Sequence, residues 1–167
     1  MEKERNHIVG FYILFAAGII MDFIPIIIIE QMGLCVALVA IVAAYIYRWR
    51  ADNDSLTYNH MSFLITTFWA SSVILLVGIV LAIAVIYKAG NHTLIADLVD
   101  AHRNGEILTE QRMQITFTDY VRVNWKLLLA VSIPTLGPGV IYLIYRVGQG
   151  MHRAVHGHRI ARPKAWL

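Results

Sequence analysis

Charge is scarce in this sequence. Only 15% of its 167 residues are Asp, Glu, Lys or Arg, and 58% are hydrophobic, whereas about a quarter of the residues in a soluble domain are charged. The apolar residues are gathered in runs of about 20, the length that a helix needs to cross a bilayer. These features exclude an ordinary soluble domain and predict an all-α integral membrane protein.

Cysteine is almost absent too, and so are catalytic motifs. Cys35 is the only cysteine, which excludes intramolecular disulfides and thiolate clusters for zinc or iron and sulfur. No P-loop, HExxH sequence, nucleophile elbow or paired glycine-rich motif is found, so we expect no enzyme. The net charge of +3 indicates lipid headgroups rather than nucleic acid, because the basic residues border apolar runs.

Four membrane spans are predicted within a single membrane domain, 1–167. Their approximate ranges are 8–29, 33–48, 62–87 and 126–145. The third is the clearest, because it contains no charged residue. The fourth contains Pro134 and Pro138 with neighbouring glycines, which predicts a kink or break at its centre.

The first two spans share one apolar run and need a turn between them. We place this turn at 30–33, where polar side chains reach interfacial water and Gly33 tolerates a turn backbone. Pro25 then lies in the last turn of the first helix. The alternative, a turn at 22–25, would leave the first helix only about 14 residues, too short for a full span.

The polar stretch 88–124 predicts an amphipathic helical hairpin between the third and fourth spans. Thr93 suits the start of its first helix, Asn104 and Gly105 suit its end, and Thr109 suits the start of the second. The apolar residues of the first helix share one face, which we expect to contact a partner: Leu94, Ile95, Leu98 and Val99.

The distribution of basic residues predicts the orientation. Nine of the 14 Lys and Arg residues lie on one side of the four spans: Lys3, Arg5, Arg48, Arg50, Arg146, Arg153, Arg159, Arg162 and Lys164. Positively charged flanks stay on the cytoplasmic side. Both termini, including a basic tail at 146–167, are therefore predicted to be cytoplasmic, and the hairpin extracytoplasmic.

Several sequence blocks resemble a family of small bacterial inner-membrane proteins. The blocks are YILFAAG at 12–18, AAYIYRWRAD at 43–52, YNHMSFLITTFW at 58–69 and VIYLIYRVGQGMHRAVHGHRIARPKAW at 140–166. That family is distantly similar to the twenty-kilodalton subunit of the chloroplast inner-envelope protein import machinery. The resemblance implies a location in the bacterial inner membrane and marks these motif residues: Arg48, His60, Thr67, Phe68, Trp69 and Arg146.

Two groups of polar residues are candidates for chemistry. His152, His156 and His158 have spacing that would suit a metal, although a basic tail facing lipid headgroups explains the same segment more simply. Asp22 is the one acid within a predicted span, where a carboxylate indicates an ion or proton path unless it is protonated or faces water.

These observations predict a non-enzymatic accessory or structural subunit of a larger bacterial inner-membrane complex. Its expected partners are membrane lipids and other integral membrane subunits, with no nucleic acid. No cofactor is expected, although a bound lipid would fit. The alternative is a channel or protein-translocation component acting as a homo-oligomer, which the import-machinery resemblance, Asp22 and the interrupted fourth span favour.

Overall fold

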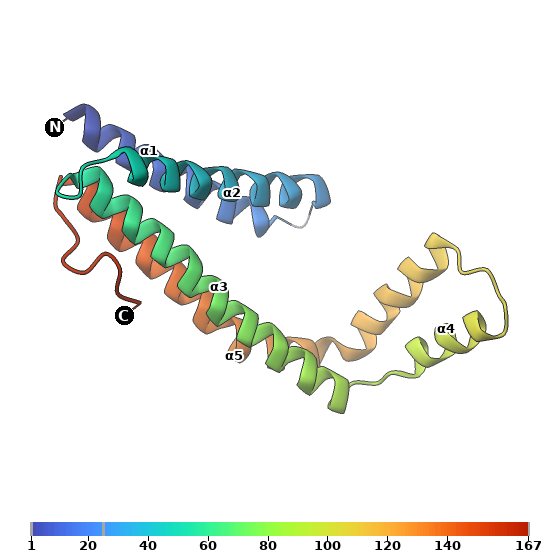
Figure 1. Cartoon of the computed structure of the whole chain (residues 1–167). Helices are drawn as coiled ribbons and strands as arrows, with labels where there is room; N and C mark the ends of the chain where they lie inside the picture. Colours follow the sequence, from blue (N-terminus) through green and yellow to red (C-terminus); the bar gives the residue numbers. More distant parts are fainter. Residues whose placement is uncertain (1, 25, 167) are drawn as a thin grey trace. The chain divides into compact units, whose positions relative to one another are not determined.

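The computed structural model describes residues 2–24 and 26–166, and the regular secondary structure within them is all helical. Its five helices are α1 Glu2–Asp22, α2 Ile27–Arg50, α3 Leu56–Ala89, α4 Thr93–Arg103 and α5 Glu110–Val155 (Figure 1). Within the described residues, three helices are long and apolar enough to cross a membrane: α2, α3 and α5. The all-α prediction is confirmed.

The chain divides into two compact units, and α3 and α5 contribute to both. Unit one contains the described residues up to 73 and from 140 onward, whereas unit two contains 74–139. The buried core of unit one comes from α1, α2, α3, the end of α5 and the segment that follows it. Its largest fully buried side chains include Tyr12, Phe15, Met61, Phe63 and Leu64.

The connection between the first two helices lies earlier than predicted. α1 ends at Asp22 and α2 begins at Ile27, so the turn predicted at 30–33 is wrong and the alternative position is correct. The length argument against that alternative fails because α1 starts at Glu2 and has 21 residues. A residue before proline avoids the α conformation, which favours an early end, although Pro25 itself and its predicted place lie outside the described residues.

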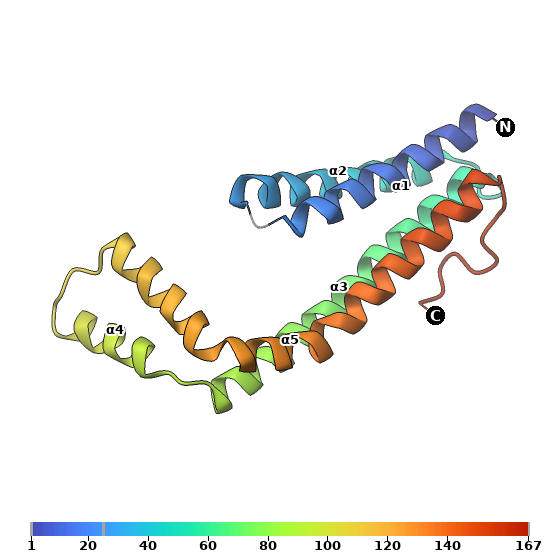
Figure 2. The same ribbon diagram turned by 180° about the vertical axis from the view of Figure 1, so that it is seen from behind.

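Small residues allow α1 and α2 to pack closely as an antiparallel pair, side by side in both views (Figures 1 and 2). A Cβ added to Gly33 would lie 2.7 Å from the carbonyl oxygen of Gly18. A Cβ added to Gly18 would lie 2.7 Å from the backbone nitrogen of Ala37. Gly33 therefore serves this close helix contact rather than the predicted turn.

The helices α3 and α5 extend beyond the predicted ends of their spans. α3 starts at Leu56 rather than near 62, because the Ser55 hydroxyl oxygen accepts a hydrogen bond from the backbone N–H of Tyr58 at 3.0 Å. α5 continues to Val155 rather than ending near 145. It stops in a Schellman motif, in which Gly157 has a φ of 68° and the N–H of His158 bonds to the carbonyl of Arg153 at 2.9 Å.

The helix α5 continues without interruption across both of its prolines. Pro134 and Pro138 lie inside the continuous helical range, so the predicted break is wrong and only a kink is compatible with the structure. Each proline lacks an N–H, which leaves the carbonyls of Ala130 and Pro134 without their usual helical donors. Within unit two, α3 approaches this region closely, because a Cβ added to Gly78 would clash with the backbone oxygen of Thr135.

Two helical arms occur where the hairpin was predicted, α4 and the first part of α5 (Figure 2). α4 ends at Arg103 with Asn104 as its cap, and Gly105 has a φ of 82°. α5 begins directly after Thr109, whose hydroxyl oxygen accepts a bond from the N–H of Arg112 at 3.3 Å. These predicted helix ends are confirmed.

The predicted cap at the start of α4 is wrong. Thr93 is the first residue of the helix rather than its cap. Its N–H and its hydroxyl both donate to Oδ1 of Asn91, at 3.1 and 2.8 Å. The N–H of Asn91 in turn donates to Oδ1 of Asn124 at 2.8 Å, so α5 helps to hold this connection.

Replacement of Gly18 by leucine should destabilise unit one. The new side chain would meet the backbone of α2, and overpacking of this kind costs about 1–3 kcal/mol. Gly10→Leu is the matched control, because a Cβ there meets nothing within 4 Å. Thermal unfolding in detergent should show a lower midpoint for G18L only. Equal midpoints for the two variants would contradict the close contact.

Candidate functional site at the carboxyl-terminal tail

His60 lies at the centre of a buried polar network in unit one. It is fully buried in α3, with Nδ1 3.1 Å from the hydroxyl of Tyr12 and Nε2 3.0 Å from the carbonyl oxygen of His158. A carbonyl only accepts, so in the neutral imidazole Nε2–H donates to His158 and Nδ1 accepts from Tyr12. His60 thereby connects α1, α3 and the residues that follow α5.

Asn59, beside His60, pairs with the backbone of Ile160 in both directions. The Ile160 N–H donates to Oδ1 at 2.8 Å, and Nδ2 donates to the Ile160 carbonyl at 3.0 Å. Asn59 is 5% exposed and Ile160 is 7% exposed. This reciprocal pair satisfies both backbone groups of a buried residue that lies outside any helix.

Arg146 is a buried cation on α5, with only 6% of its surface exposed. Its Nε donates to the Thr67 hydroxyl at 3.3 Å and an NH2 group donates to the carbonyl of Ala165 at 2.9 Å. The guanidinium carbon lies 4.0 Å from the ring centre of Phe63. Neutral acceptors and a ring face therefore surround this charge, and within the described residues it has no acidic partner.

Four side chains together hold the segment 156–166, and we name them the tail clasp: Asn59, His60, Tyr142 and Arg146. Tyr142 completes the set, because its hydroxyl donates to the carbonyl of Trp166 at 2.6 Å. The predicted basic tail beginning at 146 is therefore corrected. Its first ten residues belong to α5, and residues 156–166 fold back against α3 and α5.

The network uses nearly all of its polar atoms internally. Among the described residues, Ser62 is the only one with a buried side-chain polar atom that lacks a hydrogen-bond partner. Each member of the tail clasp donates to a backbone carbonyl of the tail, and Arg146 also donates to the Thr67 hydroxyl. This arrangement is suited to holding the tail in place rather than to binding a substrate.

The residues that the family resemblance singles out fall into two groups in the structure. His60, Thr67 and Arg146 meet around the tail, and the ring of Phe68 packs edge-on against Phe15, with 6.4 Å between ring centres. Arg48 and Trp69 instead meet at Tyr45. The Tyr45 ring lies 5.3 Å from the Arg48 guanidinium, and its hydroxyl accepts a bond from the Trp69 indole at 2.8 Å.

Sequence reasoning missed three members of this network: Tyr12, Asn59 and Tyr142. All three lie within the sequence blocks already singled out. Asn59 carried a usable signal, since an amide next to a histidine at the start of an apolar helix must find buried partners. The partner itself, Ile160, is 101 positions away, and no local pattern indicates it.

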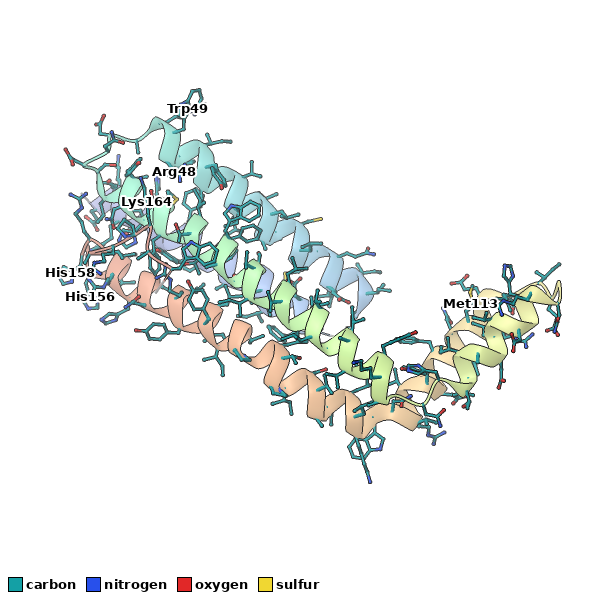
Figure 3. The ribbon with its side chains drawn as sticks, turned by 60° about the horizontal axis from the view of Figure 1, so that its bottom comes forward. Arg48, Trp49, Met113, His156, His158 and Lys164 are labelled. Carbon is teal, nitrogen blue, oxygen red and sulfur yellow. The ribbon has the colours of Figure 1, made fainter. Side chains whose placement is uncertain are left out.

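The three candidate metal-ligating histidines are neighbours at the end of α5. The ring centres of His152 and His156 are 4.5 Å apart, and those of His156 and His158 are 6.0 Å apart. Figure 3 labels His156 and His158 at this end of unit one. Nδ1 of His156 lies 2.8 Å from the carbonyl of His152. Within the described residues, no group of three or more potential ligands is arranged to hold a metal ion.

Asp22 and the predicted partner face occupy exposed positions. Asp22 is the last residue of α1, next to the connection to α2, and lines a hollow with Glu30 and Gln31. On α4, Ile95 and Val99 are 36% and 43% exposed, whereas Leu94 and Leu98 are half-buried. The apolar face of α4 is thus only partly covered by unit two.

An acid of α1 supports the start of α3. The carboxylate of Glu4 accepts bonds from the N–H and the hydroxyl of Thr57, at 3.0 and 2.9 Å. The backbone hydrogen bond from Thr57 is the main cause that holds the pKa of Glu4 below its ordinary value of 4.5, against the opposing effect of burial. A carboxylate at this helix start also interacts favourably with the helix dipole.

Comparisons of the chain with protein-family models, with curated proteins and with solved structures gave no match.

Replacing Arg146 with methionine should release the tail. The Ala165 carbonyl loses a charge-assisted bond worth about 1.5–3 kcal/mol, so we expect trypsin to cut after Arg159 or Lys164 about tenfold faster or more. Arg122→Met is a control, because Arg122 is exposed in unit two. Cleavage of R146M at the wild-type rate would contradict the role of Arg146 in holding the tail.

A matched tyrosine pair tests the same clasp without altering charge. Tyr142→Phe removes the hydroxyl that bonds to Trp166, whereas Tyr145→Phe alters a side chain that is 63% exposed. Loss of one neutral hydrogen bond costs about 0.5–1.5 kcal/mol, so Y142F should be cut several times faster and Y145F should match the wild type.

Glu4→Gln should weaken unit one in a pH-dependent manner. Because the folded-state pKa of Glu4 is lowered, its stabilisation is complete above the ordinary value of 4.5 and is lost as the pH falls through the lowered value. At neutral pH we expect E4Q to be about 0.5–1 kcal/mol less stable than the wild type. In thermal unfolding this difference should vanish in acid, and Glu2→Gln should show none.

Proposed function

We propose that this chain is a four-span protein of the bacterial inner membrane, with both termini cytoplasmic, that acts as a non-enzymatic accessory subunit of a larger membrane complex. In this arrangement the apolar part of α1 is the first span, and α2, α3 and the later part of α5 are the others. The excess of Lys and Arg on one side of these helices supports the orientation.

The observation that carries the proposal is the distribution of side chains, with polar groups buried inside unit one and apolar groups exposed on its helices. Three buried polar side chains of unit one, Asn59, His60 and Arg146, bond to the chain's own tail, while the helices present apolar surface outward. In α2 the exposed side chains include Ile27, Ile28, Leu34, Val39 and Val42, each at least 56% exposed. Acyl chains or neighbouring helices would cover such a surface, and water would not.

The apolar face of α4 is the proposed contact with an extracytoplasmic partner. Ile95 and Val99 are four positions apart, so they share one helical face, and both are exposed. The opposite face carries Asp97 and Asp100, which are exposed. An amphipathic helix of this kind suits docking into an apolar groove of another protein.

A channel or translocation component acting as a homo-oligomer is the second candidate. The two prolines inside α5 favour it, because they leave the carbonyls of Ala130 and Pro134 without helical donors at a depth where such groups line pathways in transporters. The distant similarity of the resembled bacterial family to an import-machinery subunit is a second argument for this candidate. Reconstituted protein should then conduct ions, and liposomes without any flux would count against this candidate.

Affinity purification in mild detergent tests the leading proposal. The wild-type chain should retain a membrane protein partner in stoichiometric amounts, as measured by mass spectrometry. Val99→Asn should lose that partner, whereas Asp97→Asn, on the polar side of α4, should keep it. A lone monodisperse monomer, or equal retention by both variants, would defeat the docking role assigned to α4.

A further inference from the structure

A hollow with aromatic and basic walls lies where α2 ends in unit one. It has a volume of about 570 Å³, and its lining includes Tyr45, Arg48, Trp49, Ala51, Asn53 and Tyr58. Figure 3 shows Arg48, Trp49 and Lys164 at the same end of unit one. The size is within the range of small-molecule sites, and none of the earlier contacts of the tail clasp use this space.

Two cations lie against two aromatic rings beside the hollow. The guanidinium of Arg48 is 5.3 Å from the ring centre of Tyr45, and Nζ of Lys164 is 5.6 Å from that of Tyr58. Nζ of Lys164 also lies 3.3 Å from the Tyr58 hydroxyl. Because Trp69 bonds to the hydroxyl of Tyr45, the ring beneath Arg48 is held in place.

The tail clasp brings Lys164 to this position. Lys164 is 106 positions from Tyr58 in sequence, and it precedes Ala165, whose carbonyl is bonded to Arg146. Arg48, which lines the hollow, therefore comes from α2, and Lys164, which lies against the lining residue Tyr58, comes from the folded tail. This junction is absent from a chain in which the tail extends freely.

Among the described residues, neither Arg48 nor Lys164 forms an ion pair with an acid. The lining of the hollow includes no carboxylate among the described residues. The ion pairs of the described chain lie in unit two, between Arg103 and Asp100 and between Arg112 and Glu106. Uncompensated positive charge next to a hollow attracts an anion, most strongly where apolar surroundings reduce screening.

The surroundings of the hollow favour a lipid over a small soluble anion. Trp49 is 86% exposed at its rim, and tryptophan and tyrosine gather at the level of lipid headgroups. Immediately before it, α2 exposes apolar side chains such as Val42 and Ile46. A ligand with an anionic head and acyl tails would contact both surfaces, whereas free phosphate would contact only the cations.

We propose that Arg48 and Lys164 form a binding site for the headgroup phosphate of an anionic phospholipid. Asn53 supplies amide groups for hydroxyls of the headgroup, and the rings of Tyr45 and Trp49 contact the glycerol and the start of the acyl chains. The inference rests on the membrane location proposed above but requires no protein partner. The site would couple an ordered tail to the lipid composition of the surrounding leaflet.

Lipid retention by the purified full chain tests the site. The protein is equilibrated in nanodiscs with equal amounts of phosphatidylglycerol and phosphatidylcholine, and the lipids that remain bound are counted by native mass spectrometry. The wild type should retain phosphatidylglycerol preferentially. Each cation near an anionic surface contributes about 1 kcal/mol, or about fivefold, so Arg48→Gln with Lys164→Gln should reduce this preference about 25-fold.

The matched control removes the same charge elsewhere. Arg50 and Arg162 are both exposed and lie close in sequence to the two cations, so Arg50→Gln with Arg162→Gln should leave the preference within about threefold of wild type, since charges outside the hollow contribute little. Equal losses in the two double variants would overturn the site and leave only general attraction to basic protein. Equal retention of the two lipids by the wild type would also overturn it.

Two measurements on the wild type keep the test independent of variant folding. Raising the salt concentration should weaken phosphatidylglycerol retention and leave phosphatidylcholine retention unchanged; an unchanged preference would overturn the proposal. Inorganic phosphate at the concentration of the lipid should fail to displace phosphatidylglycerol, and full displacement would indicate a phosphate site instead. Partner retention in mild detergent is a separate readout, so loss of lipid preference and loss of a partner are distinguishable.

Discussion

The order of unit one depends on satisfying one buried cation, Arg146. Removing a guanidinium from water is costly unless hydrogen-bond acceptors or ring faces replace the lost hydration. Here the acceptors are the Thr67 hydroxyl and the Ala165 carbonyl, with Phe63 under the guanidinium. The carbonyl belongs to the tail, so the charge is fully satisfied only when the tail folds back, and the tail is ordered by the same contact.

His60, another member of the tail clasp, extends this constraint to α1 and α3. Tyr12 of α1 bonds to His60 of α3, and His60 bonds to the His158 carbonyl. On the side of α5, Gly150 leaves room for the Tyr12 ring, since a Cβ there would lie 2.5 Å from the ring hydroxyl. One chain of polar contacts therefore joins α1, α3 and the tail, with α5 packed against it. At a membrane boundary, such contacts satisfy the backbone of a segment that has no helix of its own.

Local signals predicted the helix ends well where the partners are close in sequence. Thr109 caps α5 and Gly105 ends α4 because each bonds within a few residues. Thr93 fails as a cap because Asn91, two positions away, accepts its bonds. The predicted turn between α1 and α2 was misplaced because the polar segment from Glu2 to His7 was left out of the first helix. The structure includes this segment in α1, which makes the helix long enough to end at Asp22. Gly33 then suits both a turn and a close helix contact, and sequence alone does not separate the two.

The sequence by itself determined that the chain is helical, that long apolar runs make up most of it, and that its basic residues border those runs. Composition and hydrophobic periodicity are properties of a single helical segment, so they can be read from the sequence without knowing which other helices it contacts. The tertiary structure alone decided that the tail folds back, which polar residues hold it and that Lys164 stands beside Tyr58. Those contacts join residues 19 to 106 positions apart, and their geometry arises only after the helices have packed.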